Sequence, residues 1–182
     1  DALLGKVNPS GKLSMSFPRN VGQIPLYYNH KNTGRPLTAK WFAKFQSNYI
    51  DVPNDPLYPF GYGLSYTQFE YGAMQLSAKQ LKGNQTLRVT VPVKNAGKYA
   101  GKEVVQLYIR DEVGTITRPV QELKGFNKIE LAPGETKNIS FSVHTDRLAY
   151  MGADYTRIVD AGTIVLTAGS SRSDAQLTTR IT

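Results

Sequence analysis

The sequence has 182 residues, of which 40% are hydrophobic and 20% charged, a composition typical of a globular rather than a disordered protein. It contains no cysteine and only two histidines, which excludes disulfides, thiol catalysis and thiolate metal sites, and no metal or cofactor site is predicted. The formal net charge of +8 is spread along the chain without a basic run, which favours a solvated surface over nucleic-acid binding. No apolar stretch has the length of a membrane span, so neither nucleic acid nor membrane is an expected partner.

Residues 1–65 lack the pattern of a complete domain. Leu13, Met15 and Phe17 alternate with serines, which predicts a strand. Pro18 ends this pattern, and prolines and aromatic side chains come after it without a regular period. The chain also starts without the basic and apolar segments of a signal peptide. One strand and such a stretch cannot close a core. We therefore expect residues 1–65 to be the irregular tail and linker of a truncated α/β domain, or a wrap that packs on residues 66–182.

Residues 66–182 show the alternation of half-buried strands, with turn signals about every 8–12 residues. The first strand is expected over 87–93, where Pro92 cannot donate a ladder hydrogen bond and therefore predicts a sheet edge or a bulge. A strand over 104–109 has apolar residues on both faces. The remaining expected elements are strands at 129–131, 139–143, 164–168 and 177–181 and a type II turn at 132–135. The pattern predicts a mainly β fold, an immunoglobulin or fibronectin type III-like β-sandwich.

The usual signatures of catalysis are missing. Residues 63–67 begin like a nucleophile elbow but lack its closing glycine, and no phosphate-binding glycine motif occurs. Fourteen carboxylates are present, and most fall in expected turns or on polar strand faces. A retaining glycosidase needs two carboxyl groups about 5–5.5 Å apart. Nothing in the pattern indicates such a pair, and we predict no catalytic residue in this chain.

The aromatic residues of 27–66 allow two interpretations: a platform that stacks on sugar rings, or the filling of an interface between domains. The most polar cluster of the chain lies in the same stretch. The candidate substrate-binding residues there are Tyr28, Asn29, His30, Arg35 and Trp41. Such a loop either reaches a ligand or only satisfies its own backbone, and the sequence leaves both interpretations open.

A longer pattern runs through six segments in chain order. They are LSMSFPR at 13–19, VGQIPLYYNH at 21–30, PFGYGLSYT at 59–67, EVVQLYI at 103–109, RPVQELKGF at 118–126 and LAPGE at 131–135. Together they resemble the C-terminal end of family 3 glycoside hydrolases, the β-glucosidase family. The first two look like the end of that family's α/β-sandwich domain, the third like its junction to the next domain, and the last three like the fibronectin type III-like domain that ends many members. A departure at 160–162 changes a turn, not a chemistry.

The resemblance implies a retaining β-glucosidase-type hydrolase that cleaves terminal β-linked sugars. Such enzymes use an Asp nucleophile from an N-terminal barrel and a Glu acid/base from the second domain. Trp41, the only tryptophan, comes directly after Lys40 and so does not match the nucleophile motif, and residues 1–65 contain no Glu. Both catalytic groups would therefore lie upstream of Asp1, and the chain itself would be a non-catalytic structural or accessory part.

The resemblance also divides the chain. Residues 1–65 would be the C-terminal tail of the α/β-sandwich catalytic domain with its linker, and residues 66–182 the fibronectin type III-like domain. The expected partners are the upstream catalytic domains of the same protein and a β-linked oligosaccharide or glycoside, and the expected location is periplasmic or secreted. The alternative is an independent carbohydrate-binding or adhesion module of fibronectin-like fold, in which the aromatic residues would be ligand platforms.

Overall fold

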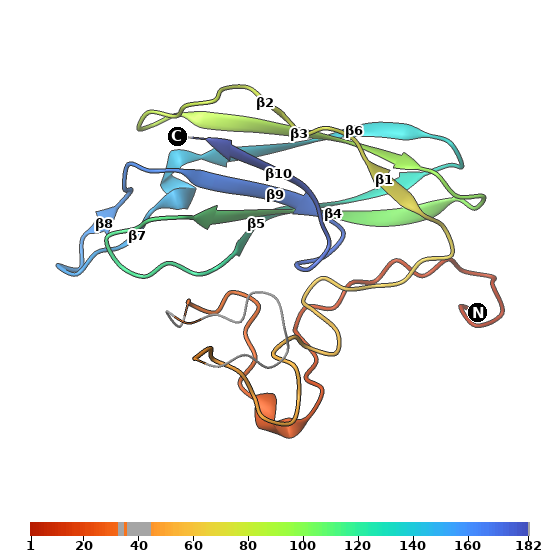
Figure 1. The fold of residues 1–182 in the computed structure, drawn as a ribbon. Coiled ribbons are helices and arrows are strands. Elements are labelled where there is room, and N and C mark those ends of the chain that lie inside the picture. The colour runs from red at the N-terminus through yellow and green to blue at the C-terminus, as the bar shows by residue number, and fades with distance from the viewer. Residues whose placement is uncertain (33–34, 36–44, 182) are drawn as a thin grey trace.

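The computed structural model describes residues 1–32, 35 and 45–181, and Figure 1 shows a β-sandwich with an irregular segment lying against one side of it. We call residues 1–65 the tail and residues 66–181 the sandwich. Within the described part of the tail, the 3-10 helix η1 (Val21–Gln23) is the single helical turn. In the described ranges no helix has the length and hydropathy needed to cross a bilayer.

The sandwich consists of two antiparallel four-stranded sheets. The strands of the first sheet are β1 (Phe69–Tyr71), β2 (Gln75–Leu76), β3 (Thr86–Asn95) and β6 (Thr136–His144). The second sheet has the order β10-β9-β4-β5, with β4 (Gly101–Asp111), β5 (Glu122–Leu131), β9 (Ile164–Gly169) and β10 (Ala175–Ile181). Between β6 and β9 the chain forms the 3-10 helix η2 (Thr145–Leu148) and a hairpin of β7 (Tyr150–Met151) and β8 (Arg157–Ile158).

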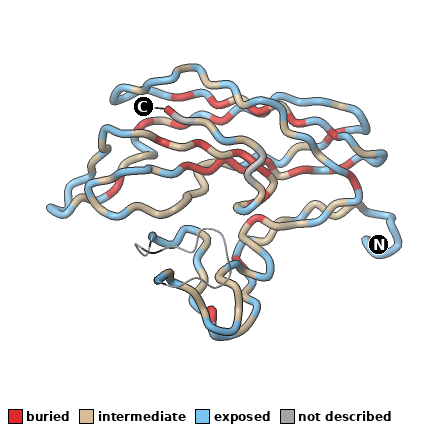
Figure 2. Tube along the Cα trace, in the orientation of Figure 1, coloured by how far each residue is buried: buried red, intermediate tan, exposed pale blue. Residues whose placement is uncertain are grey.

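The core lies between the two sheets and results from the alternation of apolar residues along the strands. Buried side chains in β3 and β4 include Leu87, Val89, Val91, Val93, Val105, Leu107 and Ile109. Burying such a side chain contributes about 1.5–3 kcal/mol. In Figure 2 the buried residues concentrate in the strands, whereas the tail is mostly exposed or intermediate. The predicted mainly β sandwich is confirmed.

Pro92 lies inside a sheet, so the prediction of an edge or a bulge at its strand is wrong. β3 pairs with β6 in unbroken register on one side and with β1 and β2 on the other. On that second side β1 ends and β2 begins around Pro92, and the connecting Gly72 donates its N–H to the Pro92 carbonyl (2.8 Å). In an antiparallel ladder the N–H and C=O of a residue point the same way. The missing N–H of Pro92 therefore faces the gap between two short strands.

The turn between β5 and β6 carries the chain from one sheet to the other. Glu135 N donates to the Ala132 carbonyl at 3.0 Å, and Gly134 has a φ of 77°. A type II turn needs this left-handed conformation at its third residue, which glycine adopts without strain. The predicted type II turn at 132–135 is confirmed.

The strand predicted over 13–17 does not form. A single bridge joins Phe17 to Tyr58, with Phe17 N donating to the Tyr58 carbonyl at 2.8 Å. Ser16 is buried, whereas Met15 and Phe17 are 61% and 42% exposed. The segment runs beside another part of the tail instead of joining a sheet, and at residues 15–17 the burial is the reverse of what alternation alone predicts.

Asn95 ends β3 with a fully buried side chain whose hydrogen-bonding groups are all used. Its Oδ1 accepts from Thr67 Oγ1 (2.6 Å) and Gly97 N (3.0 Å). Its Nδ2 donates to the carbonyls of Tyr99 (2.8 Å) and Leu131 (3.1 Å). One amide thereby joins the start of the sandwich, the turn after β3 and the end of β5.

We expect Asn95→Asp to lower the free energy of unfolding by about 2–4 kcal/mol, because a carboxylate oxygen would then face two buried carbonyls. Asn138→Asp, on the exposed face of β6, is the matched control and should cost less than about 0.5 kcal/mol. Urea denaturation monitored by circular dichroism measures both. Equal costs at the two positions would contradict the role assigned to Asn95.

Candidate functional site

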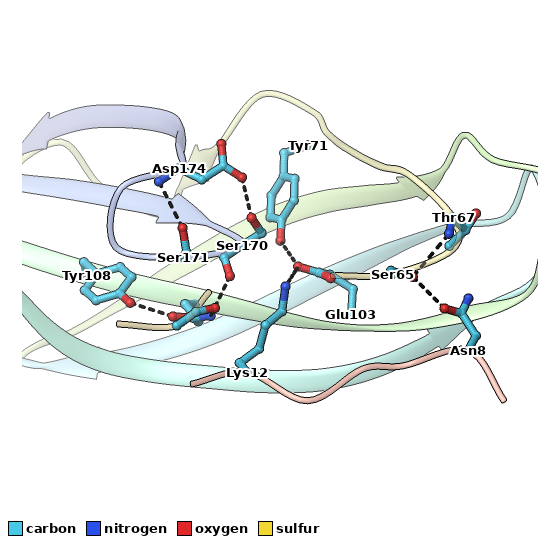
Figure 3. A network of polar contacts seen from close by, with 12 residues as sticks. Asn8, Lys12, Ser65, Thr67, Tyr71, Glu103, Tyr108, Ser170, Ser171 and Asp174 are labelled. Atoms are coloured by element: carbon cyan, nitrogen blue, oxygen red, sulfur yellow. Dashed lines mark hydrogen bonds and ion pairs between the residues drawn. The ribbon is translucent and has the colours of Figure 1, made fainter. Parts of the chain in front are cut away.

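The tail and the sandwich meet along polar contacts that involve Asn8, Lys12 and Gly61 of the tail, and we call these contacts the seam (Figure 3). At one end of the seam, Asn8 Oδ1 accepts hydrogen bonds from Ser65 Oγ and Tyr66 N, both at 2.9 Å. Asn8 Nδ2 donates to the Ala100 carbonyl at 2.9 Å. A single tail amide therefore holds the junction near residue 65 and the turn between β3 and β4.

The centre of the seam is a buried ion pair, visible in Figure 3. Lys12 Nζ lies 3.3 Å from Glu103 Oε1, and Tyr71 OH donates to the same oxygen at 3.0 Å. The side chain of Glu103 is 3% exposed and that of Lys12 13%. Burial raises the pKa of Glu103 against the opposing charge of Lys12, and burial together with the Glu103 charge raises the pKa of Tyr71. Because Tyr71 belongs to β1 and Glu103 to β4, one carboxylate joins the tail to both sheets.

A second buried contact lies on the face of β4 that the tail covers. Gln106 Nε2 donates to the carbonyls of Gly61 (3.2 Å) and Ser170 (2.7 Å), and its Oε1 accepts from Tyr108 OH (2.5 Å). Gly61 has a φ of 81°, and a Cβ at this position would lie 2.2 Å from Gln106 Oε1. Only glycine therefore allows the tail to approach β4 this closely. Burial raises the pKa of Tyr108, which keeps its hydroxyl a donor.

Tyr28 anchors the tail beside this contact. Its ring stacks on Phe60 at 4.1 Å between centroids and meets Tyr108 edge-on at 6.2 Å. Its hydroxyl accepts a hydrogen bond from Leu123 N at 3.2 Å. Aromatic pairs of this kind contribute about 0.5–1.5 kcal/mol beyond the area that they bury. The ring, through Tyr108 of β4, and the hydroxyl, through Leu123 of β5, together fix the start of the polar loop that begins at Tyr28.

The residues after Tyr28 lie against the sandwich like a short extra strand. Val120 N donates to the His30 carbonyl at 2.9 Å, and Lys31 forms an isolated antiparallel bridge with Pro119. Backbone pairing of this kind sets the position of a segment through its main chain, whatever its side chains do. The chain just before β5 therefore determines where this loop lies.

Arg118 orders the segment to which the loop pairs. Its guanidinium donates to Glu122 Oε2 at 3.0 Å, lies 4.0 Å from Asp111 Oδ2, and stacks 4.0 Å above the ring of Tyr150. Tyr150 OH in turn donates to Asp160, and this hydrogen bond lowers the pKa of Asp160. Two carboxylates, those of Asp111 and Glu122, thus share the single cation of Arg118.

A cleft of about 890 Å³ opens between the loop and the sandwich. The tail lines it with the rings of Tyr27, Tyr28 and Tyr49 and with several amide and hydroxyl groups, and the sandwich contributes Arg110 and Arg172. Aromatic faces beside amides and guanidinium groups suit either sugars or carboxylates.

The predicted substrate-binding residues occupy different settings. Tyr28 is half-buried, whereas Asn29, His30 and Arg35 are exposed, and Tyr28 and His30 line the cleft. The Arg35 carbonyl accepts a hydrogen bond from Ser47 N at 2.7 Å. Trp41 lies outside the described residues. Contact with a substrate stays a prediction for all five.

No carboxyl group among the described residues has the setting of a glycosidase acid. Within them, Glu103 is the one carboxyl whose pKa is raised, and it is buried in the seam rather than facing the cleft. Hydrogen bonds lower the pKa of the carboxyl groups of Glu135, Asp154 and Asp160. A search of the same residues finds no group of three or more His, Asp or Glu that could hold a metal ion.

Sequence reasoning missed four residues of this region: Lys12, Glu103, Gln106 and Arg172. Glu103 could have been recognised from the sequence. It lies two residues before the buried Val105 in β4, so its side chain points to the same, inward face of the strand. A charged residue at an inward position requires a partner. No local pattern names Lys12 as that partner, since the two residues lie far apart in the chain.

Comparisons with known proteins agree with the geometry. The family model described as glycosyl hydrolase family 3 C-terminal domain matches residues 1–66, and the one described as fibronectin type III-like domain matches residues 103–172. A periplasmic β-glucosidase of Salmonella typhimurium is 49% identical over 82% of this chain, and a β-xylosidase of Formosa agariphila is 42% identical over all of it. The crystal structure of a β-glucosidase from Listeria innocua matches 100% of this chain with a TM-score of 0.94 at 42% identity. The chain belongs to glycoside hydrolase family 3, as part of its C-terminal region.

The family 3 match also shows how much of each relative the chain represents. It spans 20% of the Salmonella protein, 24% of the Formosa protein and 25% of the Listeria chain. The seam connects the two matched segments, because Lys12 and Gly61 lie in the first and Glu103 and Gln106 in the second. The resemblance inferred from the sequence motifs is confirmed.

We expect Lys12→Met to lower the free energy of unfolding by about 3 kcal/mol at pH 7, because it leaves Glu103 buried without a counter-charge. The double variant Lys12→Met/Glu103→Gln should recover most of this loss, since the amide oxygen still accepts from Tyr71. Lys102→Met is the matched control: it breaks the exposed Lys102–Glu130 pair (3.5 Å) and should cost less than about 0.5 kcal/mol. Urea denaturation of the wild type, these three variants and the single variant Glu103→Gln measures the coupling, and purely additive losses would contradict the pairing.

The cost of Lys12→Met should shrink as the pH falls. A carboxyl whose pKa is raised by folding contributes stability below its ordinary value of 4.5, and this contribution is lost as the pH rises through the raised value. Without Lys12 the opposing charge is gone and the pKa of Glu103 rises further. Unfolding measured from pH 7 down toward pH 5 should therefore bring the variant closer to the wild type. A gap that widens on acidification would contradict this assignment.

Proposed function

We propose that this chain is the non-catalytic C-terminal part of a retaining β-glycosidase that cleaves terminal β-linked glucosides or related sugars. Relatives named β-glucosidase and β-xylosidase support the activity, and the chain spans about a fifth to a quarter of their length. The nucleophile and the acid/base would come from polypeptide that precedes residue 1. A periplasmic or secreted location is proposed with it, supported by the name of the Salmonella relative.

The observation that carries this proposal is how polar and apolar side chains are distributed over the two sides of the tail. Its polar groups face the sandwich along the seam, whereas Met15, Phe17, Ile24, Ile50 and Tyr58 are all exposed. Clustered exposed apolar side chains mark a surface that another polypeptide covers. We therefore assign residues 1–65 to the catalytic α/β domain of the parent enzyme and residues 66–182 to a fibronectin-like domain that supports it.

The support has a defined target, the polar loop that begins at Tyr28. The sandwich holds the first residues of this loop through the Tyr28 ring and the Val120–His30 hydrogen bond. In our proposal this fixed base directs Asn29, His30, Arg35 and Trp41 toward the β-linked substrate of the parent enzyme. The sandwich would then contribute to catalysis by position alone.

The first experiment compares hydrolysis of an aryl β-glucoside by this 182-residue chain and by the full-length parent. We expect no turnover above buffer for the chain and clear turnover for the parent. The parent ending at residue 65 should lose activity as well, because the tail then lacks all the partners that the sandwich contributes to the seam. Turnover by the chain that survives repurification would contradict the proposal, as would full activity of the truncated parent.

Tyr28→Phe tests the positioning role in the parent enzyme. The variant keeps the stacked ring and removes the acceptor of the Leu123 N–H, a loss of about 1 kcal/mol. We expect KM to rise by up to about tenfold while kcat changes little, since the loop shifts and the catalytic carboxyls do not. Tyr155→Phe, on the exposed loop between β7 and β8, is the matched control. Equal KM values for the two variants would contradict the proposal that this loop contacts the substrate.

The alternative function, an independent carbohydrate-binding or adhesion module, is favoured by one observation, the three tyrosine rings that line the cleft. Isothermal titration of this chain with β-linked oligosaccharides separates the two functions. Binding that disappears in Tyr27→Ala with stability unchanged would favour the module. Absence of binding, with activity restricted to the parent, would favour the supporting role.

A further inference from the structure

The cleft between tail and sandwich carries an excess of positive charge. Among the residues that line it, Lys31, Arg110 and Arg172 are cationic and Asp55 is the single carboxylate in the described ranges. Two of the three cations, Arg110 and Arg172, come from the sandwich. A concave site with this balance attracts anionic groups.

Arg172 is the residue that makes the site specific. It lies in the loop between β9 and β10, where its backbone N–H donates to the Phe60 carbonyl at 3.0 Å and so holds the loop against the tail. Its side chain is half-buried, and burial lowers the pKa of its guanidinium. Within the described residues its buried Nε has no hydrogen-bond partner. The negative charge of Asp55 opposes the lowering of this pKa, but Asp55 is exposed and does not reach Nε. A buried guanidinium nitrogen without an acceptor is costly, and a carboxylate is the group that matches the planar donors of arginine.

We propose that this cleft receives a carboxylate side chain from the polypeptide that precedes residue 1 in the parent enzyme, with Arg172 as its receptor and Arg110 as a second cation. The inference rests on the proposed function and names the contact by which the upstream domains engage the sandwich directly. The tail would then lie between the upstream domains and the sandwich, and these two would also be joined directly by the ion pair at Arg172.

Two observations favour a polypeptide over a free acidic sugar as the occupant. Tyr27, which lines the cleft, is 64% exposed, and the apolar side chains of Ile24, Leu57 and Tyr58 in the same tail are exposed as well. A protein segment covers such a surface together with the cleft, whereas a sugar fills the cleft alone. The relatives are about four times as long as this chain, and in our proposal the parent has the same additional polypeptide.

Amine-to-carboxylate cross-linking is a direct test of this contact. In the full-length parent carrying Arg172→Lys, a water-soluble carbodiimide joins the new amine to any carboxylate that it touches. Peptide mass spectrometry should find position 172 linked to an Asp or Glu upstream of residue 1. The Lys102–Glu130 pair (3.5 Å) is the internal positive control, and Arg88→Lys on the exposed face of β3 is the matched negative control. A link to Asp55 alone, or no link at position 172 beside a formed Lys102–Glu130 link, overturns the proposal.

A second measurement needs no substitution. An arginine-specific dicarbonyl reagent should modify Arg172 in this 182-residue chain and leave it unmodified in the parent, while Arg88 reacts alike in both. Equal reactivity of Arg172 in the two proteins overturns the proposal. Protection that appears in the parent only after a carboxylated oligosaccharide is added also overturns it, because the occupant is then a ligand.

These outcomes separate the cleft from the proposed function. Suppose that the parent hydrolyses the glucoside and shows neither a cross-link at position 172 nor protection of Arg172. This result would contradict the proposal for the cleft and leave the proposed function intact. A parent that lacks hydrolysis rejects the proposed function, whatever the cross-linking shows.

Discussion

One strand, β4, is buried on both of its faces, and the arrangement of the whole chain depends on this. It turns Val105 and Leu107 into the core between the sheets, and Gln106 and Tyr108 toward the tail. Buried amide and hydroxyl groups need hydrogen-bond partners. The Gly61 carbonyl provides one for Gln106, so the tail completes the hydrogen bonding of the sandwich rather than merely covering it. The sandwich and the tail are therefore one structural unit, although the family models divide them.

Along the seam, the tail accordingly turns polar side chains toward the sandwich, and it leaves several apolar side chains exposed. A segment that only wraps a domain places its apolar side chains inward and its polar ones outward, because burial of apolar area is its main source of stability. Here Lys12 and Asn8 face the sandwich while Met15 and Phe17 face solvent. The polar side of the tail fixes its direction and register on the sandwich, since hydrogen bonds and ion pairs are directional. In our proposal the exposed apolar side is covered by another polypeptide, which would give the tail two neighbours instead of one.

How far the sequence predicts this structure depends on the length and locality of each pattern. Strands β3, β4, β6 and β9 are long enough for a period of two to show, and they form where that period predicts. Strands β1 and β2 are three and two residues long, too short to show any period. The rule for Pro92 failed because it assumes a continuous neighbour, and β3 instead has two short ones with a gap between them.

The site was less predictable than the fold because its contacts join distant positions. The motif around Tyr28 and the glycines near residue 61 marked the right stretch of chain, but not the groups that they contact. Glu103 could be recognised only as a charged side chain on the inward face of a strand, and its pairing with Lys12 depends on where the tail lies. The alternation at 13–17 predicted buried apolar side chains, but Met15 and Phe17 are exposed and Ser16 is buried, because the pattern contains no information about which polypeptide will cover it.

A physical reason for a fibronectin-like domain in a glycoside hydrolase emerges from the main-chain contacts of the loop. Leu123, within β5, bonds the Tyr28 hydroxyl, and Val120, just before β5, bonds the His30 carbonyl. β5 is itself paired with β4 along its length. Groups attached to a sheet in this way are held more rigidly than groups on a free loop. A misplacement of about 1 Å at a reacting centre can cost about a hundredfold in rate. In our proposal, a domain that supplies no catalytic acid or base can therefore still determine how fast the parent enzyme works.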